Sequence, residues 1–119
     1  MVSKKPRGYI PRKGDIVWLT FNPQAGHEQK GRRPALVISP QNYNQKSSLV
    51  LVCPISSKIK GYPFEVAVEK LKISGVVLAD QIKSVDWKAR KAKKITTIQK
   101  TSLDEVLRLI ILLINKNST

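Results

Sequence analysis

The chain has 119 residues, enough for one domain with a modest core, and 41% of them are hydrophobic, which argues against disorder throughout. It has 22 Lys and Arg against 8 Asp and Glu, and the resulting net charge of +14 favours a polyanionic partner such as nucleic acid. Apolar runs are too short to cross a bilayer, and the single cysteine, Cys53, excludes an internal disulfide framework. We therefore expect a cytoplasmic protein that does not act at membranes.

In chain order, a basic arm at residues 1–13 precedes one domain at residues 14–119. β-branched and aromatic runs predict strands, the last two of them weaker, at residues 16–21, 34–39, 48–55, 62–68, 75–79, 82–86 and 94–98. Polar residues between them predict a long loop, a turn and a second loop at residues 22–33, 41–47 and 56–61. This pattern indicates a mainly β fold, a small and strongly curved antiparallel barrel with one terminal helix.

The C-terminal segment is the clearest predicted helix. Ser102 and Glu105 have the spacing of a capping box at its start. An apolar stripe follows, formed by Leu103, Val106, Leu107, Ile110 and Ile114. The last two turns are apolar almost all round, so we expect a homodimer that buries Leu109, Ile110 and Leu113. Coverage by loops of the same chain is the alternative.

Several familiar chemistries are absent from the sequence. It has no glycine-rich phosphate loop, and its acidic residues are scattered rather than clustered as ligands for a divalent metal. One cysteine and one histidine leave no zinc site and no two-histidine acid–base pair within a chain. We therefore expect no metal and no cofactor. Cleavage of RNA by its own 2′-hydroxyl remains possible, because that reaction needs only positioning, proton transfer and charge stabilisation.

Two positions at the ends of predicted strands fit such a reaction. Arg33 lies between Gly31 and Pro34, which would present its planar guanidinium to a phosphate at the mouth of a strand. Ser56 follows a buried strand, and its hydroxyl could contact a phosphate or carry a proton. A solvated charge and a turn residue are the ordinary alternatives for these two. For Cys53, a small buried hydrophobe is favoured over a nucleophile.

The chain resembles the MazF/PemK toxins of bacterial toxin–antitoxin systems from residue 14 onward. The resemblance is carried, in order, by residues 14–18, 21–23, 26–29, 31–35, 52–57, 60–66 and 75–84. Gly-x-Arg-Pro at 31–34 and Ala-Asp-Gln-x-Lys-Ser at 79–84 are specific when they occur together. The MazF branch fits better, because Leu78 occupies the position where the PemK branch has a functional arginine.

This resemblance implies an SH3-like barrel that forms a symmetric dimer. It implies a type II toxin that cuts single-stranded mRNA at a short sequence without metal and leaves a 2′,3′-cyclic phosphate. It also implies a MazE-like antitoxin whose acidic, disordered tail covers the RNA groove, and a chain of charge +14 suits both polyanions. A nucleic-acid-binding barrel that does not cut, and a gyrase poison like CcdB, remain the alternatives.

Carried over residue by residue, the resemblance implies catalytic roles for Arg33, Glu28 and Ser56, the last where most relatives have threonine. Arg33 would stabilise the phosphorane, Glu28 or a water would take the 2′ proton, and Ser56 would orient the phosphate. Ser57 could replace Ser56. RNA contacts are expected from His27, Gln29, Ser57, Lys58, Gln81 and Lys83, with a solvated loop residue as the alternative for His27. The basic run at 88–94 could bind RNA, the antitoxin tail or only solvent, and a solvated face is the default interpretation.

Overall fold

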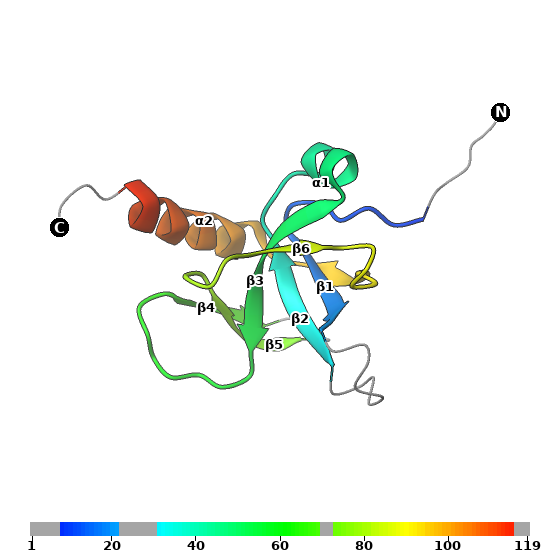
Figure 1. The fold of residues 1–119 in the computed structure, drawn as a ribbon. Coiled ribbons are helices and arrows are strands. Elements are labelled where there is room, and N and C mark those ends of the chain that lie inside the picture. The colour runs from blue at the N-terminus through cyan, green and yellow to red at the C-terminus, as the bar shows by residue number, and fades with distance from the viewer. Residues whose placement is uncertain (1–7, 22–30, 70–72, 116–119) are drawn as a thin grey trace.

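The computed structural model describes residues 8–21, 31–69 and 73–115, and Figure 1 shows their arrangement. In chain order the elements are β1 (Asp15–Thr20), β2 (Arg32–Val37), α1 (Gln41–Ser47), β3 (Leu49–Ser56), β4 (Glu65–Glu69), β5 (Ser74–Leu78), β6 (Lys83–Asp86), β7 (Lys93–Thr97) and α2 (Lys100–Asn115). Each predicted strand is present, with bounds shifted by at most three residues. The largest shift is in β4, which begins after Pro63, a residue that cannot donate to a ladder.

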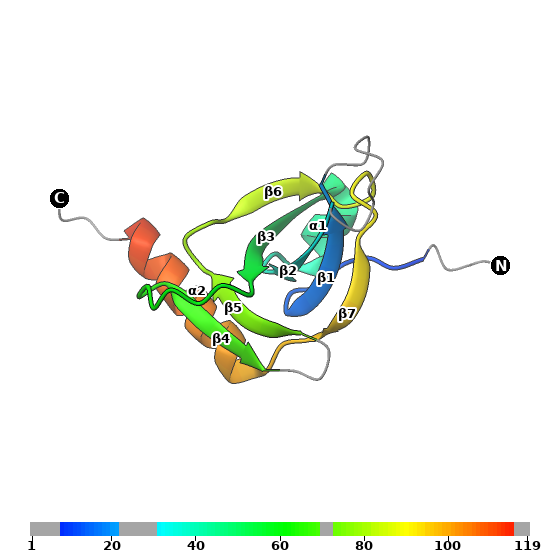
Figure 2. The same cartoon turned by 90° about the horizontal axis from the view of Figure 1, so that it is seen from below.

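The strands form one strongly curled antiparallel sheet in the order β4-β5-β3-β2-β1-β7, with β6 paired to β3 (Figure 2). β3 is shared between the parts of this sheet. Its residues 49–52 pair with β6, its residues 52–54 with β2, and its residues 55–56 with β5. The mainly β, curved antiparallel architecture with a C-terminal helix is therefore as predicted.

Both faces of the central strands are buried, which explains the unbroken apolar runs in their sequences. One face packs under β4, β5 and α2 and includes Ile16, Leu36 and Cys53. The opposite face packs toward β6 and includes Val17 and Val52. A strand buried on both faces cannot alternate between apolar and polar residues. These two apolar layers hold the strand ends that carry the site.

The segment at 41–47, expected to be a turn, is the short helix α1. Its one buried side chain is Asn44, whose amide donates to the carbonyls of Pro11 at 2.8 Å and Ser39 at 3.1 Å. Trp87 Nε1 donates in turn to the Asn44 carbonyl at 2.8 Å. The helix has no apolar stripe, so hydrophobic periodicity could not reveal it. Its place in the fold is set by hydrogen bonds to distant segments.

The predicted capping box of the C-terminal helix is wrong. Helix α2 begins at Lys100, and the Leu103 N–H donates to the Gln99 carbonyl at 3.0 Å. The Glu105 carboxylate pairs with Arg108 on the next turn, at 2.7 Å, instead of capping the helix start. Hydrogen bonds from Arg108 also lower the pKa of Glu105. The strand end at β7 thus leads directly into the helix.

The buried face of α2 also differs from the prediction. Val106, Leu109 and Ile110 are the buried residues, and the helix packs against β4. Ile114, assigned to the stripe, is 72% exposed. Of the residues expected at a dimer interface, Leu109 and Ile110 are only 6% and 7% exposed and have little surface left for a second copy, whereas Leu113 is 44% exposed. Neither helix in the described part of the chain is long and apolar enough to cross a membrane.

Part of the basic arm packs onto the barrel. Tyr9 donates its hydroxyl hydrogen bond to the buried carboxylate of Asp15, and burial together with this bond raises the pKa of Tyr9. Pro11 is fully buried, and Lys94 forms an ion pair with Asp15 at 3.5 Å. The boundary drawn between arm and domain stays a prediction.

Candidate active site

The candidate site lies where β2 and β3 separate. The pairing of the two strands ends at Ala35 and Pro54. Pro34 and Pro54 have no N–H group, so they cannot continue a regular ladder. Beyond this point β3 pairs with β5 instead, through residues 55–56. Arg33 and Ser56, which are far apart in sequence, are left on the two sides of the opening.

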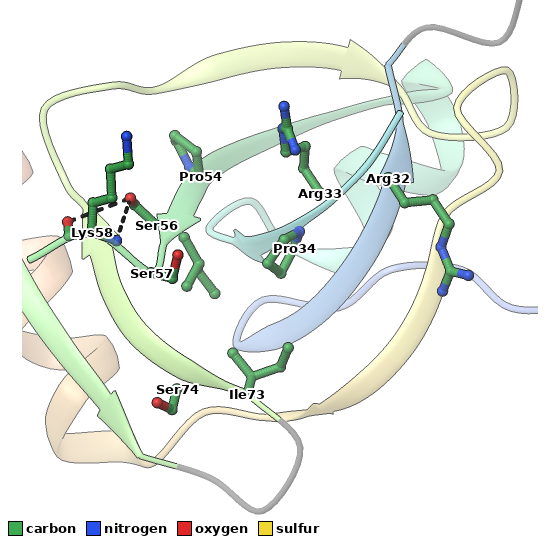
Figure 3. Close-up of a pocket in the computed structure, with 10 residues that line it drawn as sticks. Arg32, Arg33, Pro34, Pro54, Ser56, Ser57, Lys58, Ile73 and Ser74 are labelled. Carbon is green, nitrogen blue, oxygen red and sulfur yellow. Dashed lines mark hydrogen bonds between the residues drawn. The ribbon is translucent and has the colours of Figure 1, made fainter. Parts of the chain in front are cut away.

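A cavity of about 470 Å³ occupies this opening (Figure 3). It is lined by Arg32, Arg33, Pro34, Pro54, Ile55, Ser56, Ser57, Lys58, Ile73 and Ser74. It therefore combines cations and hydroxyl groups with an apolar floor, a lining suited to a phosphodiester with its sugars.

The two neighbouring arginines point in different directions from β2 (Figure 3). The guanidinium of Arg32 lies over the ring of Trp18, 4.6 Å from its centroid, in a cation–π contact. Arg33 is exposed and also lines a second cavity, of about 320 Å³. This second cavity brings in Phe21, Gln81 and Lys83. Arg33 thus stands between two hollows, and the predicted contacts Gln81 and Lys83 share one of them.

Phe21 lines the second cavity, and its ring is in cation–π contact with two basic side chains. Lys83 Nζ lies 5.7 Å, and the Arg90 guanidinium 5.1 Å, from the ring centroid. Arg90 also donates from Nη1 to the carbonyls of Thr20 and Phe21, at 3.3 and 3.1 Å. One residue of the basic run 88–94 is therefore not a free solvated charge but a clamp on the end of β1.

Ser56 is half-buried and its hydroxyl is held by the following loop. Oγ accepts a hydrogen bond from the Lys58 N–H at 3.0 Å and donates one to the Lys58 carbonyl at 3.4 Å, as Figure 3 shows. Ser57 is exposed and lines the same cavity as Ser56. Of the two serines, Ser56 has the more defined hydroxyl position.

His27, Glu28 and Gln29 lie outside the described residues. The two described residues that flank this segment are joined directly, because the Phe21 N–H donates to the Gly31 carbonyl at 2.6 Å. Arg33 follows Gly31 by two residues. The structure therefore describes the position of Arg33, the candidate arginine, but not that of Glu28, the candidate base.

Among the described residues, neither Cys53 nor any Asp or Glu lines the cavity of about 470 Å³. Cys53 is fully buried, and burial raises the pKa of its thiol from 9.0 to about 12. A thiol in such surroundings is a poor nucleophile. Within residues 8–21, 31–69 and 73–115, no three His, Cys, Asp or Glu side chains gather as a metal site would require.

Sequence reasoning missed two residues that shape the site. A Cβ at Gly75 would lie 2.3 Å from the carbonyl oxygen of Ser56, so glycine permits β5 to approach β3. A glycine inside a predicted strand is a signal for such an approach. Glu65 accepts hydrogen bonds from the loop after Ser56; it lies in the segment 60–66 that carries the family resemblance, but no role was assigned to it.

Comparison with known proteins gives consistent relationships. The family profile described as "PemK-like, MazF-like toxin of type II toxin-antitoxin system" matches residues 12–114. The Endoribonuclease toxin MazF of Escherichia coli (strain K12) is 47% identical over 98 residues, which are 82% of this chain and 85% of that protein. Endoribonuclease PemK of Escherichia coli is 33% identical over 111 residues, covering 85% of this chain and 84% of that protein.

Solved structures agree with these relatives. The crystal structure of MazF (Form-I) from Deinococcus radiodurans has a TM-score of 0.81 and 48% identity, and covers 92% of this chain and 100% of that one. The MazE-MazF structure (Form-III) from the same organism has a TM-score of 0.83 and 45% identity, with the same coverage. Fold, motifs and overall identity lead to one assignment, and this chain belongs to the PemK-like, MazF-like toxins of type II toxin–antitoxin systems.

Proposed function

We propose that this chain is an endoribonuclease toxin that cuts single-stranded RNA at a short sequence without a metal ion. The observation that carries the proposal is that Arg33 and Ser56 line one cavity at the opening between β2 and β3. Relatives at 47% and 33% identity that are named endoribonucleases support it. The net charge of +14 supports a polyanionic substrate held by its backbone.

In the proposed reaction, the 2′-oxygen of the RNA attacks the adjacent phosphorus and loses its proton to a base. The bond from phosphorus to the 5′-oxygen breaks, and that oxygen takes up a proton. The products are a 2′,3′-cyclic phosphate and a 5′-hydroxyl, so no water is consumed and no metal is needed. Most of the rate enhancement then comes from in-line positioning and from stabilising the charge of the phosphorane.

Arg33 suits the stabilising role because a guanidinium is a permanent cation with a planar set of donors. Ser56, whose oxygen accepts the Lys58 N–H, would turn its one hydrogen from the Lys58 carbonyl to a phosphate oxygen, and Ser57 could add a second donor. Glu28 or a water is the proposed base. Lys58 lines the first cavity, Gln81 and Lys83 line the second, and all three would contact the RNA.

A type II toxin also needs an antitoxin partner. We propose an acidic, partly disordered antitoxin that competes with RNA for the same basic cavities in the cytoplasm. Solved structures of MazE-MazF from Deinococcus radiodurans, 39–45% identical to this chain, support such a partner. Both ligands are polyanions, so one positively charged surface could serve for both.

The end of α2 supports a homodimer. Its last described turns expose apolar side chains, Ile111, Leu112, Leu113 and Ile114. Contiguous apolar surface of this kind is uncommon on a monomer and is covered simply by a second copy about a twofold axis. The proposed interface therefore keeps Leu113 from the sequence-based prediction and replaces Leu109 and Ile110 by exposed neighbours.

The test is to incubate the purified protein with a long single-stranded RNA in the presence of a chelator and to map the new ends. Cleavage at one short motif, with cyclic phosphate and 5′-hydroxyl ends, is expected. RNA that stays intact but is bound would favour a binding module instead. Inhibition of gyrase supercoiling without RNA breakage would favour a CcdB-like activity.

A further inference from the structure

The loop between β3 and β4 is closed by a single carboxylate. Glu65, the first residue of β4, accepts the Lys60 N–H on Oε2 at 3.1 Å and the Gly61 N–H on Oε1 at 2.9 Å. Gly61 has φ +82, a conformation that suits glycine and that brings successive N–H groups toward one anion. The N–H of Glu65 donates in turn to the Tyr62 carbonyl at 3.1 Å, which closes the loop at its base.

The loop that Glu65 holds forms a wall of the candidate site. Lys58, Lys60 and Tyr62 line a cavity of about 160 Å³ together with Ser56 and Gln81. Lys58 lines the large cavity as well, and its N–H is the donor that fixes the Ser56 hydroxyl. The carboxylate is thus connected to the candidate catalytic serine through one short stretch of backbone.

The negative charge of Glu65 allows a structural role to be distinguished from a simple electrostatic one. Glu65 is one of only 8 acidic residues in a chain of net charge +14, and it lies beside a site proposed to bind a polyanion. By long-range electrostatics alone, an acid at this place weakens RNA binding, and its removal would strengthen it. A structural role of the carboxylate predicts the opposite effect, because a loosened loop must be ordered at the expense of binding free energy.

We propose that Glu65 is a positioning residue for RNA binding. It holds the β3–β4 loop so that Lys58 and Lys60 face the bound RNA. This inference rests on the proposed function. It assigns Glu65 no contact with the RNA and no proton transfer. The carboxylate acts through the two backbone N–H groups that it accepts.

The experiment compares Glu65→Ala and Glu65→Gln with Glu69→Ala as the matched control. Glu69 lies on the same face of β4, is exposed, and has no hydrogen-bond or ion-pair partner among the described residues. Binding is measured with a 2′-O-methyl oligonucleotide that carries the mapped cleavage sequence and lacks the attacking hydroxyl. KM and kcat are measured on the corresponding RNA. Hydrogen exchange of the Lys60 and Gly61 amides reports on the loop without any nucleic acid.

For Glu65→Ala we expect faster exchange of both amides and a Kd and KM about tenfold higher, the equivalent of one hydrogen bond to a charged group. We expect kcat to change little, because the interaction is made equally in the ground and transition states. Glu65→Gln retains one acceptor oxygen and should lie between wild type and Glu65→Ala. Glu69→Ala should leave Kd unchanged or lower it.

Three results would overturn the proposal. Tighter binding by Glu65→Ala would mean that the carboxylate merely occupies an anion site. Unchanged amide exchange would mean that it does not hold the loop, and faster exchange with unchanged Kd would mean that the loop does not serve binding. If the wild-type chain cuts no RNA, the proposed cleavage fails and no cleavage sequence can be mapped. Amide exchange, and binding of a 2′-O-methyl oligonucleotide of mixed sequence, then still decide the role of Glu65.

Discussion

Gly75 of β5 lies so close to Ser56 of β3 that a Cβ on Gly75 would be 2.3 Å from the Ser56 carbonyl oxygen and 3.1 Å from its carbonyl carbon. Gly75 also has φ +148, a conformation that side chains rarely adopt. The candidate catalytic serine is therefore placed by a backbone contact that only glycine allows.

Replacing Gly75 with alanine is expected to lower the free energy of unfolding by about 2–3 kcal/mol, through the steric clash and the strained φ. It should also lower the cleavage rate, because Ser56 must move. Urea unfolding and cleavage by the folded fraction measure the two effects. Gly8→Ala is the control, since Gly8 has φ +84 but nothing within 4 Å of a Cβ. A Gly75→Ala variant that matches Gly8→Ala in both measurements would contradict this account.

Arg33→Ala should reduce kcat about 10²–10³-fold, the usual loss when one donor to a developing oxyanion is removed. Arg32→Ala removes the same charge from the adjacent position. Because Arg32 lies over the Trp18 ring and points elsewhere, its loss should affect RNA affinity more than kcat. Full activity in Arg33→Ala, with an unchanged circular dichroism spectrum, would show that another residue stabilises the phosphorane.

The two serines can be separated by their hydroxyl groups. Ser56→Ala should lower kcat about tenfold or more, as expected for a lost hydrogen bond to a charged phosphate, and Ser57→Ala should have a smaller effect. Ser56→Thr restores the hydroxyl and should retain activity. Single-turnover cleavage measures all three variants. If Ser57→Ala proves the more damaging change, the hydroxyl role belongs to Ser57.

Cys53 should be unreactive in the folded protein. With its pKa raised to about 12 by burial, the thiolate is only about 10⁻⁴ of the thiol at pH 8, against about a tenth for a thiol with a pKa near 9.0. A chromogenic disulfide reagent should therefore label Cys53 slowly at pH 8, faster with rising pH, and rapidly once guanidinium unfolds the chain. Fast labelling of the folded protein would reveal an exposed thiol.

The exposed end of α2 leads to a prediction for assembly. Leu113→Lys places a charge in the proposed interface and should convert a dimer to a monomer in sedimentation velocity. Thr101→Lys, at an exposed position near the start of the same helix, is the control and should remain dimeric. A monomeric wild-type chain at micromolar concentration would remove the dimer from the proposal.

Features set by neighbouring residues could be predicted from the sequence, whereas features set by contacts between distant segments could not. The strands of the sheet could be predicted because apolar runs bounded by Gly and Pro are local patterns. The helix α1 could not, because it buries only Asn44 and is held by contacts to Pro11 and Trp87. The start of α2 was misplaced because Glu105 has a competing partner, Arg108, one turn along the helix.

The sequence by itself determined the charge, the family motifs and the choice of Arg33 and Ser56 as candidates, since each depends on residue identity and nearest neighbours. Only the tertiary structure decided that these two side chains share a cavity. Prolines end the pairing of β2 and β3, and Gly75 then lets β5 take over the strand that carries Ser56. Such contacts join residues 15 to 22 positions apart in the sequence, and they arise when the sheet curls to bury both of its apolar faces.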